Sequence, residues 1–142
     1  MSPSPTALSD EVERPANGSA LELAIAAAQS ANSKTTEDTI ILDVGSLLGI
    51  TDYFVVTAGR NDRQVRAIVD EVAKGVRDAG GTTVRRVEGF REAEWVLVDY
   101  GSFVVHVFSN DARDRFSLER LWADAPRVQW DLPVVSRPAP AP

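Results

Sequence analysis

The stretch Trp95-Val-Leu-Val-Asp-Tyr-Gly-Ser-Phe-Val-Val-His-Val-Phe108 decides the fold class of this chain. Two runs rich in β-branched and aromatic residues, 95–100 and 103–108, flank the dipeptide Gly101-Ser102. Strand-forming runs that are separated by a two-residue turn containing glycine are typical of a β-hairpin. The stretch therefore predicts two neighbouring antiparallel strands.

Three further strands are predicted on the N-terminal side of this hairpin. Residues 39–44 and 53–57 are short runs of β-branched and apolar residues, and residues 82–87 are a third run with two exposed arginines. The link at 45–50 is too short for the crossover that parallel neighbours need. We therefore expect the strands at 39–44 and 53–57 to pair in an antiparallel manner.

Three helices are predicted from capping signals and apolar periodicity. Ser19 and Glu22 have the spacing of a capping box, and Asn61 and Gln64 have a similar spacing. Gly80 and the glycine after it end the second helix. The first predicted helix begins at residue 19 and ends within residues 32–34. The second begins at residue 61 and ends at residues 80–81, and the third spans residues 111–125.

The order is therefore helix, two strands, helix, three strands, helix. This order predicts an α+β fold with a mixed sheet of about five strands flanked by helices, and it excludes a repeating βαβ fold. Residues 128–135 are expected to pack as an extended strand or arm. The predicted domain spans residues 19–135, between disordered tails at 1–18, rich in proline, serine and acidic residues, and 136–142, rich in proline and alanine.

The composition of the chain argues against several classes of protein. The chain has 142 residues, no cysteine and a net charge of −6, with 44% hydrophobic residues. Without cysteine there is neither a disulfide framework nor a thiolate metal site. The negative charge argues against much direct nucleic-acid binding. No secretory signal and no membrane-spanning apolar run is apparent, so a cytoplasmic location and no membrane partner are expected.

The search for catalytic machinery finds none of the usual phosphate-loop, dinucleotide or nucleophile-elbow motifs. The one histidine, His106, lies mid-strand among valines and is expected to be a packed side chain with a hydrogen-bond partner. Asp43, Asp52 and Asp99 stand at strand ends, where they could hold metal ions for nucleotidyl or phosphoryl transfer. No Asp-x-Asp pair occurs, however, and we predict no catalytic residue, no metal and no cofactor.

A series of motifs, taken together and in order, resembles the ribosomal silencing factor family of the Iojap/RsfS type. The resemblance covers about residues 19–125. The series includes Glu88-Gly89, the run from Trp95 to Gly101, and Arg113. The matching segments are residues 51–56, 63–68, 88–89, 95–101, 104–108, 113 and 118–122.

The resemblance implies a fold related to nucleotidyltransferases without their catalytic acids. It also implies that the protein is not an enzyme. It implies binding to the large ribosomal subunit through ribosomal protein fourteen of that subunit, which blocks joining of the small subunit. Translation would thereby be repressed when nutrients are limiting. A homodimer is compatible with the family.

The resemblance also assigns partner-contacting residues. In the family the Trp-x-x-x-Asp strand faces the ribosomal protein, which transfers this role to Trp95 and Asp99. The expected contacts are Trp95, Asp99, Tyr100, Phe116, Leu118 and Glu119. Arg115 and Phe116 depart from the family, which commonly has Phe-Tyr there. Three alternatives stay open. The first is a metal-dependent nucleotidyl or phosphoryl transferase that uses the strand-end carboxylates named above. The second has Trp95 as a core residue with Asp99 as a turn residue, and the third is a dimer module that pairs through an exposed sheet edge.

Overall fold

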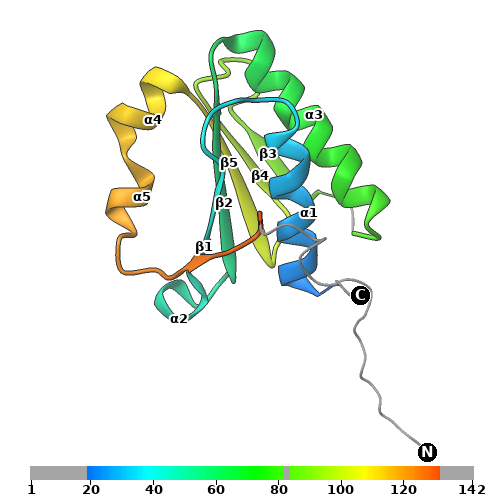
Figure 1. The fold of residues 1–142 in the computed structure, drawn as a ribbon, viewed down its shortest axis with the longest axis vertical. Coiled ribbons are helices and arrows are strands. Elements are labelled where there is room, and N and C mark those ends of the chain that lie inside the picture. The colour runs from blue at the N-terminus through cyan, green and yellow to red at the C-terminus, as the bar shows by residue number, and fades with distance from the viewer. Residues whose placement is uncertain (1–18, 82–83, 132–142) are drawn as a thin grey trace, which may run out of the picture.

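The computed structural model describes residues 19–81 and 84–131 (Figure 1). The strands are β1 (Ile40–Asp43), β2 (Tyr53–Gly59), β3 (Arg86–Glu88), β4 (Trp95–Asp99), β5 (Phe103–Ser109) and β6 (Arg127–Val128). The helices are α1 (Ala20–Asn32), α2 (Gly45–Leu48), α3 (Asp62–Asp78), α4 (Asn110–Phe116) and α5 (Leu118–Leu121). This arrangement confirms the α+β class. The predicted tails at 1–18 and 136–142, and the end of the predicted arm at 132–135, lie outside the described residues.

The strands form one mixed sheet of six strands in the order β3-β4-β5-β2-β1-β6. The predicted hairpin is confirmed, because β4 and β5 pair antiparallel. The predicted antiparallel pair β1–β2 is confirmed as well. The central contact joins β2 and β5 in parallel, with Val55 opposite Val105. The described sheet has short strands at both edges, β3 and β6, which offer few free backbone groups to a second chain.

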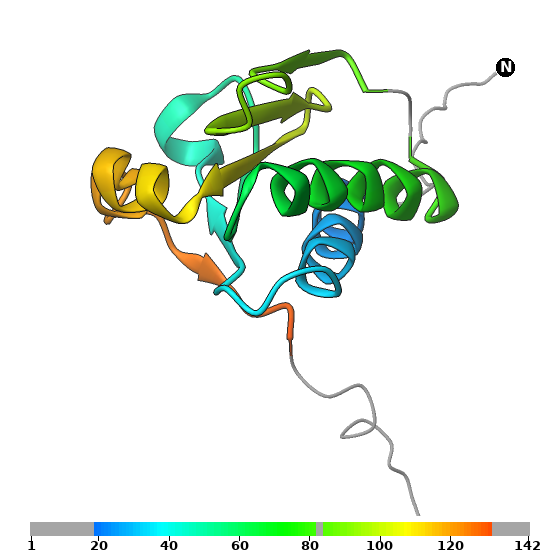
Figure 2. The same cartoon turned by 90° about the horizontal axis from the view of Figure 1, so that it is seen from above.

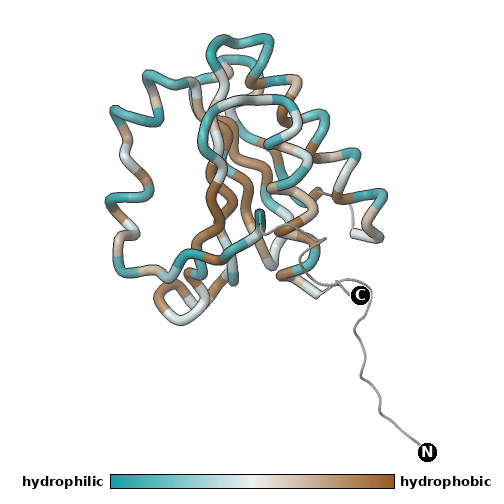
Figure 3. Tube along the Cα trace, in the orientation of Figure 1, coloured by the Kyte–Doolittle hydropathy of each residue, from teal (hydrophilic) through white to brown (hydrophobic). Residues whose placement is uncertain are grey.

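Helices cover the sheet on both faces, but not to the same extent. Helices α1 and α3 pack side by side on one face, while α4 and α5 stand on the other (Figures 1 and 2). Hydrophobic residues concentrate along the strands between these layers (Figure 3). On the second face, α4 and α5 pack over β1, β2 and β5 through Ala112 and Leu118.

Local signals in the sequence set the starts of the two long helices. Ser19 and Glu22 form the predicted capping box of α1, and the Asn61 side chain accepts a hydrogen bond from the Gln64 amide at 2.9 Å. Both caps satisfy amide groups that have no partner within the helix. Helix α3 ends at Asp78, just before Gly80, whose φ is 88°. Within the described ranges, no helix is long and apolar enough to cross a membrane.

Three predicted elements differ from the structure. The single closing helix at 111–125 was wrong, because Ser117 adopts a left-handed conformation (φ 49°) that separates α4 from α5. The strand predicted at 82–87 lies instead at Arg86–Glu88, because these are the residues that pair with β4. Residues 82–83 of the predicted strand lie outside the described residues. The sheet has six strands and not about five, because the start of the extended segment expected at 128–135 joins it as β6, with Val128 paired to Ile41 of β1.

Gly75 lets α1 and α3 approach closely. A Cβ at this position would overlap Ser30 Oγ and lie 2.9 Å from Ser30 Cβ. Replacing an interior helical glycine by alanine normally stabilises a helix, by about 1 kcal/mol. Here we expect Gly75→Ala to lower the free energy of unfolding by about 1–3 kcal/mol, because the two helices must separate.

Urea unfolding of Gly75→Ala, Ser30→Gly and the double variant measures this contact. We expect the double variant to be more stable than the two single losses of stability, added together, would predict. The reason is that the glycine introduced at position 30 makes room for the methyl group added at position 75. A Gly75→Ala protein at least as stable as the wild type would contradict the proposed close packing.

Candidate functional site

The outer face of β4 presents a row of large side chains that no helix covers completely. Trp95, Leu97 and Asp99 are partly exposed, whereas Val96 and Val98 between them are buried toward α1 and α3. Trp95 and Asp99 therefore share one face of the sheet, as the two-residue period of a strand requires for residues four apart. Together with Phe116 at the end of α4, these three residues are called the β4 surface below.

Trp95 is the most highly connected residue of the β4 surface. Its ring centroid lies 5.0 Å from that of Phe108 and 4.9 Å from that of Phe116. Its indole N–H donates a hydrogen bond of 3.1 Å to His106 Nδ1. These contacts fix the orientation of the indole while leaving part of it exposed. Trp95 is thus neither a fully buried core residue nor a free surface residue.

Phe116 extends the aromatic part of the β4 surface. Its side chain is 43% exposed and packs against Trp95. The guanidinium of Arg115 lies 5.0 Å from the Phe116 ring centroid and pairs with Glu94 at 3.0 Å. The two residues that depart from the family pattern therefore keep an aromatic ring next to Trp95 and place a charge at its margin.

His106 is the buried support of Trp95. It is only 4% exposed, and this burial lowers its pKa to about 4. Because Nδ1 accepts the indole hydrogen bond, the neutral ring carries its proton on Nε2. The prediction of a packed histidine with a hydrogen-bond partner is confirmed.

Stability should depend on pH through His106. The pKa falls from 6.5 to about 4 on folding, so the unfolded chain binds more protons between these values. The stabilisation is complete above pH 6.5 and decreases as the pH falls toward 4. Linkage predicts a loss of about 2 kcal/mol between about pH 7.5 and pH 5.

Urea unfolding at a series of pH values, compared with His106→Asn, isolates this effect. His106 is the chain's one histidine, so the variant should lose this part of the pH dependence while carboxylate effects remain. Identical slopes for the two proteins in this window would show that His106 does not become protonated on unfolding.

Asp99 stands at the far end of the β4 surface and has a structural role. Its Oδ1 accepts a hydrogen bond of 2.8 Å from the Gly101 amide, which closes the β4–β5 turn. Its Oδ2 lies 3.8 Å from Nη2 of Arg86, and the side chain is 23% exposed. Asp99 is therefore a turn residue that also presents part of its carboxylate to solvent.

The structure does not bring the other predicted contact residues to the same surface. Tyr100 is 7% exposed, lies on the opposite face and stacks on Phe103, and burial raises its pKa. Leu118, the first residue of α5, is buried against the sheet. These two residues support the strand and the helix that carry the β4 surface, and they offer little area to a partner.

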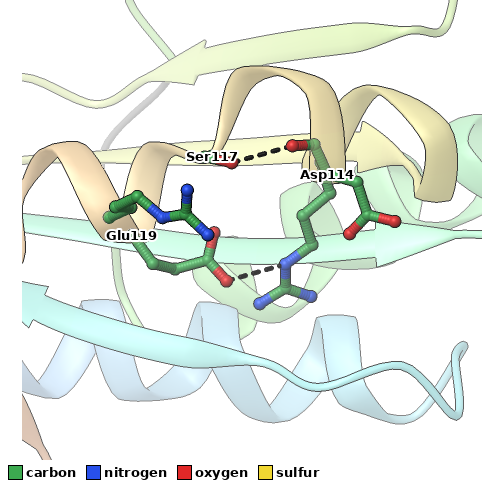
Figure 4. A pocket seen from close by; sticks show the side chains of 5 residues that line it. Asp114, Ser117 and Glu119 are labelled. Carbon is green, nitrogen blue, oxygen red and sulfur yellow. Dashed lines mark hydrogen bonds and ion pairs between the residues drawn. The ribbon is translucent and has the colours of Figure 1, made fainter.

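Glu119 belongs to a polar hollow beside α4 and α5 (Figure 4). Its carboxylate accepts a hydrogen bond of 3.1 Å from Nε of Arg113. Arg113 also donates to the carbonyl oxygen of Asp38, so it ties α4 to the start of β1. In the same hollow Ser117 Oγ donates to the Asp114 carbonyl at 2.7 Å, which stabilises the break between the helices. Glu119 is thus already paired.

Of the three acidic residues at strand ends, Asp43, Asp52 and Asp99, the structure brings the first two close together. A Cβ on Gly45 would lie 3.1 Å from Oδ1 of Asp52 and 3.7 Å from Oδ1 of Asp43, so these two carboxylates are neighbours. Burial, and then the charges of Asp43 and Asp52, raise the pKa of Tyr53. Among the described residues no three acidic or histidine side chains come close enough to hold a metal ion.

Sequence reasoning did not identify Gly89 as a residue that positions the site. Gly89 has a φ of 82°, and a Cβ there would overlap the carbonyl oxygen of Trp95. This close approach fixes where β4 begins and therefore where Trp95 lies. The Glu88-Gly89 motif was the available signal, but it does not reveal which residue the glycine meets.

Comparisons with known proteins agree with this arrangement. A family model described as "Ribosomal silencing factor during starvation" (RsfS) matches residues 17–141. The chain is 46% identical over 106 residues to the ribosomal silencing factor RsfS of Bacillus subtilis, covering 75% of this chain and 89% of that protein. It is 29% identical over 91 residues to a mouse protein named "Mitochondrial assembly of ribosomal large subunit protein 1", covering 63% of this chain and 40% of that protein.

A solved structure supports the same assignment. The crystal structure of a protein from Chromobacterium violaceum matches with a TM-score of 0.71 and 29% identity, covering 82% of this chain and 95% of that one. The relation to nucleotidyltransferases stays a prediction. The family model spans nearly the whole chain, and the sequence and structural relatives match most of the described fold. The chain belongs to the RsfS family of ribosomal silencing factors.

Proposed function

We propose that this protein binds the large ribosomal subunit and thereby prevents the small subunit from joining it. Family membership supports this proposal, and the name of the mouse relative refers to assembly of the large ribosomal subunit. The proposed action is steric: an occupied joining face lowers the number of whole ribosomes and represses translation when nutrients are limiting. This action needs no catalytic residue and no cofactor.

The observation that carries the proposal is the β4 surface. It combines a partly exposed tryptophan with an exposed phenylalanine, and both are held in place by a buried aromatic layer. Such supported aromatic residues are typical of the few side chains that dominate binding energy at protein interfaces. We propose that this surface contacts ribosomal protein fourteen of the large subunit.

The charge of the chain is compatible with this kind of partner. The net charge is −6, which disfavours docking on bare ribosomal RNA and favours a basic protein surface. Asp99 at the margin of the β4 surface adds a partly exposed carboxylate to that contact. We expect the negative charge to favour a basic partner surface, and Trp95 and Phe116 to supply most of the binding free energy.

A subunit-joining assay tests this function. Purified large and small bacterial subunits are mixed with and without the protein, and whole ribosomes are separated from free subunits on sucrose gradients. We expect the protein to decrease the peak of whole ribosomes and to migrate with the large subunit. Unchanged joining at saturating protein would contradict the steric mechanism.

We also propose that residues 1–18 are not needed for docking. The family match begins at residue 17, and the β4 surface lies wholly within the described residues. A protein that starts at residue 19 should bind large subunits with an affinity within about threefold of the full chain, because no residue of the β4 surface is removed. A larger loss in the same binding assay would place part of the contact in residues 1–18.

A further inference from the structure

A hollow of about 420 Å³ lies next to the β4 surface, on the same face of the sheet. Most of its exposed lining is apolar, and its walls come from α2, β2, β4, β5 and the end of α5. Arg85, Arg86 and Asp99 are the charged residues of its lining. Ile50, at its margin, is 82% exposed. The side chains that form its apolar walls are Leu48, Phe54, Leu97, Val104 and Trp122.

Two buried polar atoms belong to the lining of this hollow. His106 Nε2 and Thr51 Oγ1 are buried and have no hydrogen-bond partner among the residues that the structure describes. Their side chains are only 4% and 8% exposed. A buried polar group without a partner is costly, so native proteins rarely keep one. These two atoms therefore indicate a group that binds from outside the chain.

The tautomer of His106 fixes what that group must provide. The indole of Trp95 donates to Nδ1, so Nε2 carries a hydrogen and can only donate. The occupant must offer an acceptor. Arg85, Arg86 and Asp99 also line the hollow, and Glu88 pairs with Arg86 at 3.0 Å. These two cations and two carboxylates balance, so the hollow supplies no net positive charge to a carboxylate, and an uncharged acceptor fits better.

The position of the hollow identifies its occupant as part of the docking partner. Leu97 belongs both to the β4 surface and to the wall of the hollow, so the two are continuous. A partner that covers the β4 surface from Trp95 to Asp99 would lie over the hollow, because Leu97 and Asp99 line it. Burying the exposed margin at Ile50 and filling the hollow would remove apolar area from water in a single step.

We propose that the hollow receives one side chain of the ribosomal partner, apolar along its length and ending in an amide or hydroxyl oxygen that accepts the hydrogen bond of His106 Nε2. This inference rests on the proposed function and adds to it a specificity-determining residue. Trp95 supplies contact area, while His106 selects a partner side chain with an acceptor at the right depth.

Two substitutions of His106 test the roles of its two ring nitrogens separately. In His106→Asn, the amide oxygen can take the place of Nδ1 and hold the Trp95 indole, but no donor reaches the hollow. In His106→Gln, the amide N–H₂ can take the place of Nε2 and restores the donor. Thr51→Val removes the second polar atom without changing the volume of the side chain.

The experiment measures the affinity of each full-length variant for purified bacterial large subunits, with circular dichroism to confirm that each is folded. We expect His106→Asn to weaken binding about tenfold and His106→Gln to stay within about threefold of the wild type. Thr51→Val should weaken binding less than His106→Asn does.

Equal affinities for His106→Asn and the wild type would overturn this inference alone and leave the proposed function intact. Equal losses in His106→Asn and His106→Gln would also overturn it, because they would indicate a structural role for the ring. A wild-type protein that does not bind large subunits would overturn the proposed function and this inference together.

Discussion

Trp95→Ala is expected to weaken binding to the large ribosomal subunit at least about 30-fold. Truncating an aromatic residue at the centre of an interface typically costs at least about 2 kcal/mol, which corresponds to that change in affinity. The variant should also be less stable, because Trp95 packs against Phe108 and Phe116 and donates to His106. Binding must therefore be measured at a temperature where the variant is fully folded.

Trp130→Ala is the matched control for this variant. Trp130 is also a partly buried tryptophan with one hydrogen bond, from its indole N–H to the Thr39 carbonyl at 2.9 Å. It packs instead against the core that α1 and α3 cover. We expect a similar loss of stability with affinity within about threefold of the wild type. Equal losses of affinity in the two variants would show that Trp95 acts only through the fold.

Leu97→Arg is expected to have a still larger effect on docking. Leu97 is partly exposed, so an arginine there can keep its charge in water in the free protein, and the fold should be retained. Glu88, which pairs with Arg86, lies directly across from it in the sheet and adds a nearby carboxylate. On docking, the same cation would be buried against a basic partner. An uncompensated buried charge costs about 3 kcal/mol or more, roughly 150-fold in affinity.

Val87→Arg is the control for Leu97→Arg. Val87 lies in the neighbouring strand, is 42% exposed and pairs with Val98, so its side chain is on the opposite face of the sheet. The same charge placed there should leave affinity and its salt dependence nearly unchanged. If Leu97→Arg binds large subunits as well as Val87→Arg does, the docking surface is not on the outer face of β4.

Local patterns were enough to predict much of the fold. The caps at Ser19 and Asn61 and the Gly101-Ser102 turn are each satisfied within a few residues of the chain, so the sequence displays them directly. The shared face of Trp95 and Asp99 follows from the two-residue period of a strand. The same period puts Tyr100, an odd number of residues from Trp95, on the other face, where it is buried, although the resemblance assigned it to the partner contact.

Features that depend on distant residues were not predicted. The Trp95–His106 hydrogen bond joins two strands, and its partner atom is fixed only by their register. The left-handed Ser117 interrupts a segment whose composition otherwise suits a helix, and the Arg113–Glu119 contact joins α4 and α5 across this break. The hollow beside β4 likewise requires several strands and α5 to be assembled before it exists.

Co-sedimentation with purified large ribosomal subunits is the most direct test of the central claim. The wild-type protein, at micromolar concentration, is centrifuged with large subunits or with small subunits, and both pellets are analysed for bound protein. We expect saturable pelleting with large subunits and none with small subunits, together with loss of pelleting for Trp95→Ala. Wild-type protein that remains in the supernatant with large subunits would contradict the proposed binding to the large subunit.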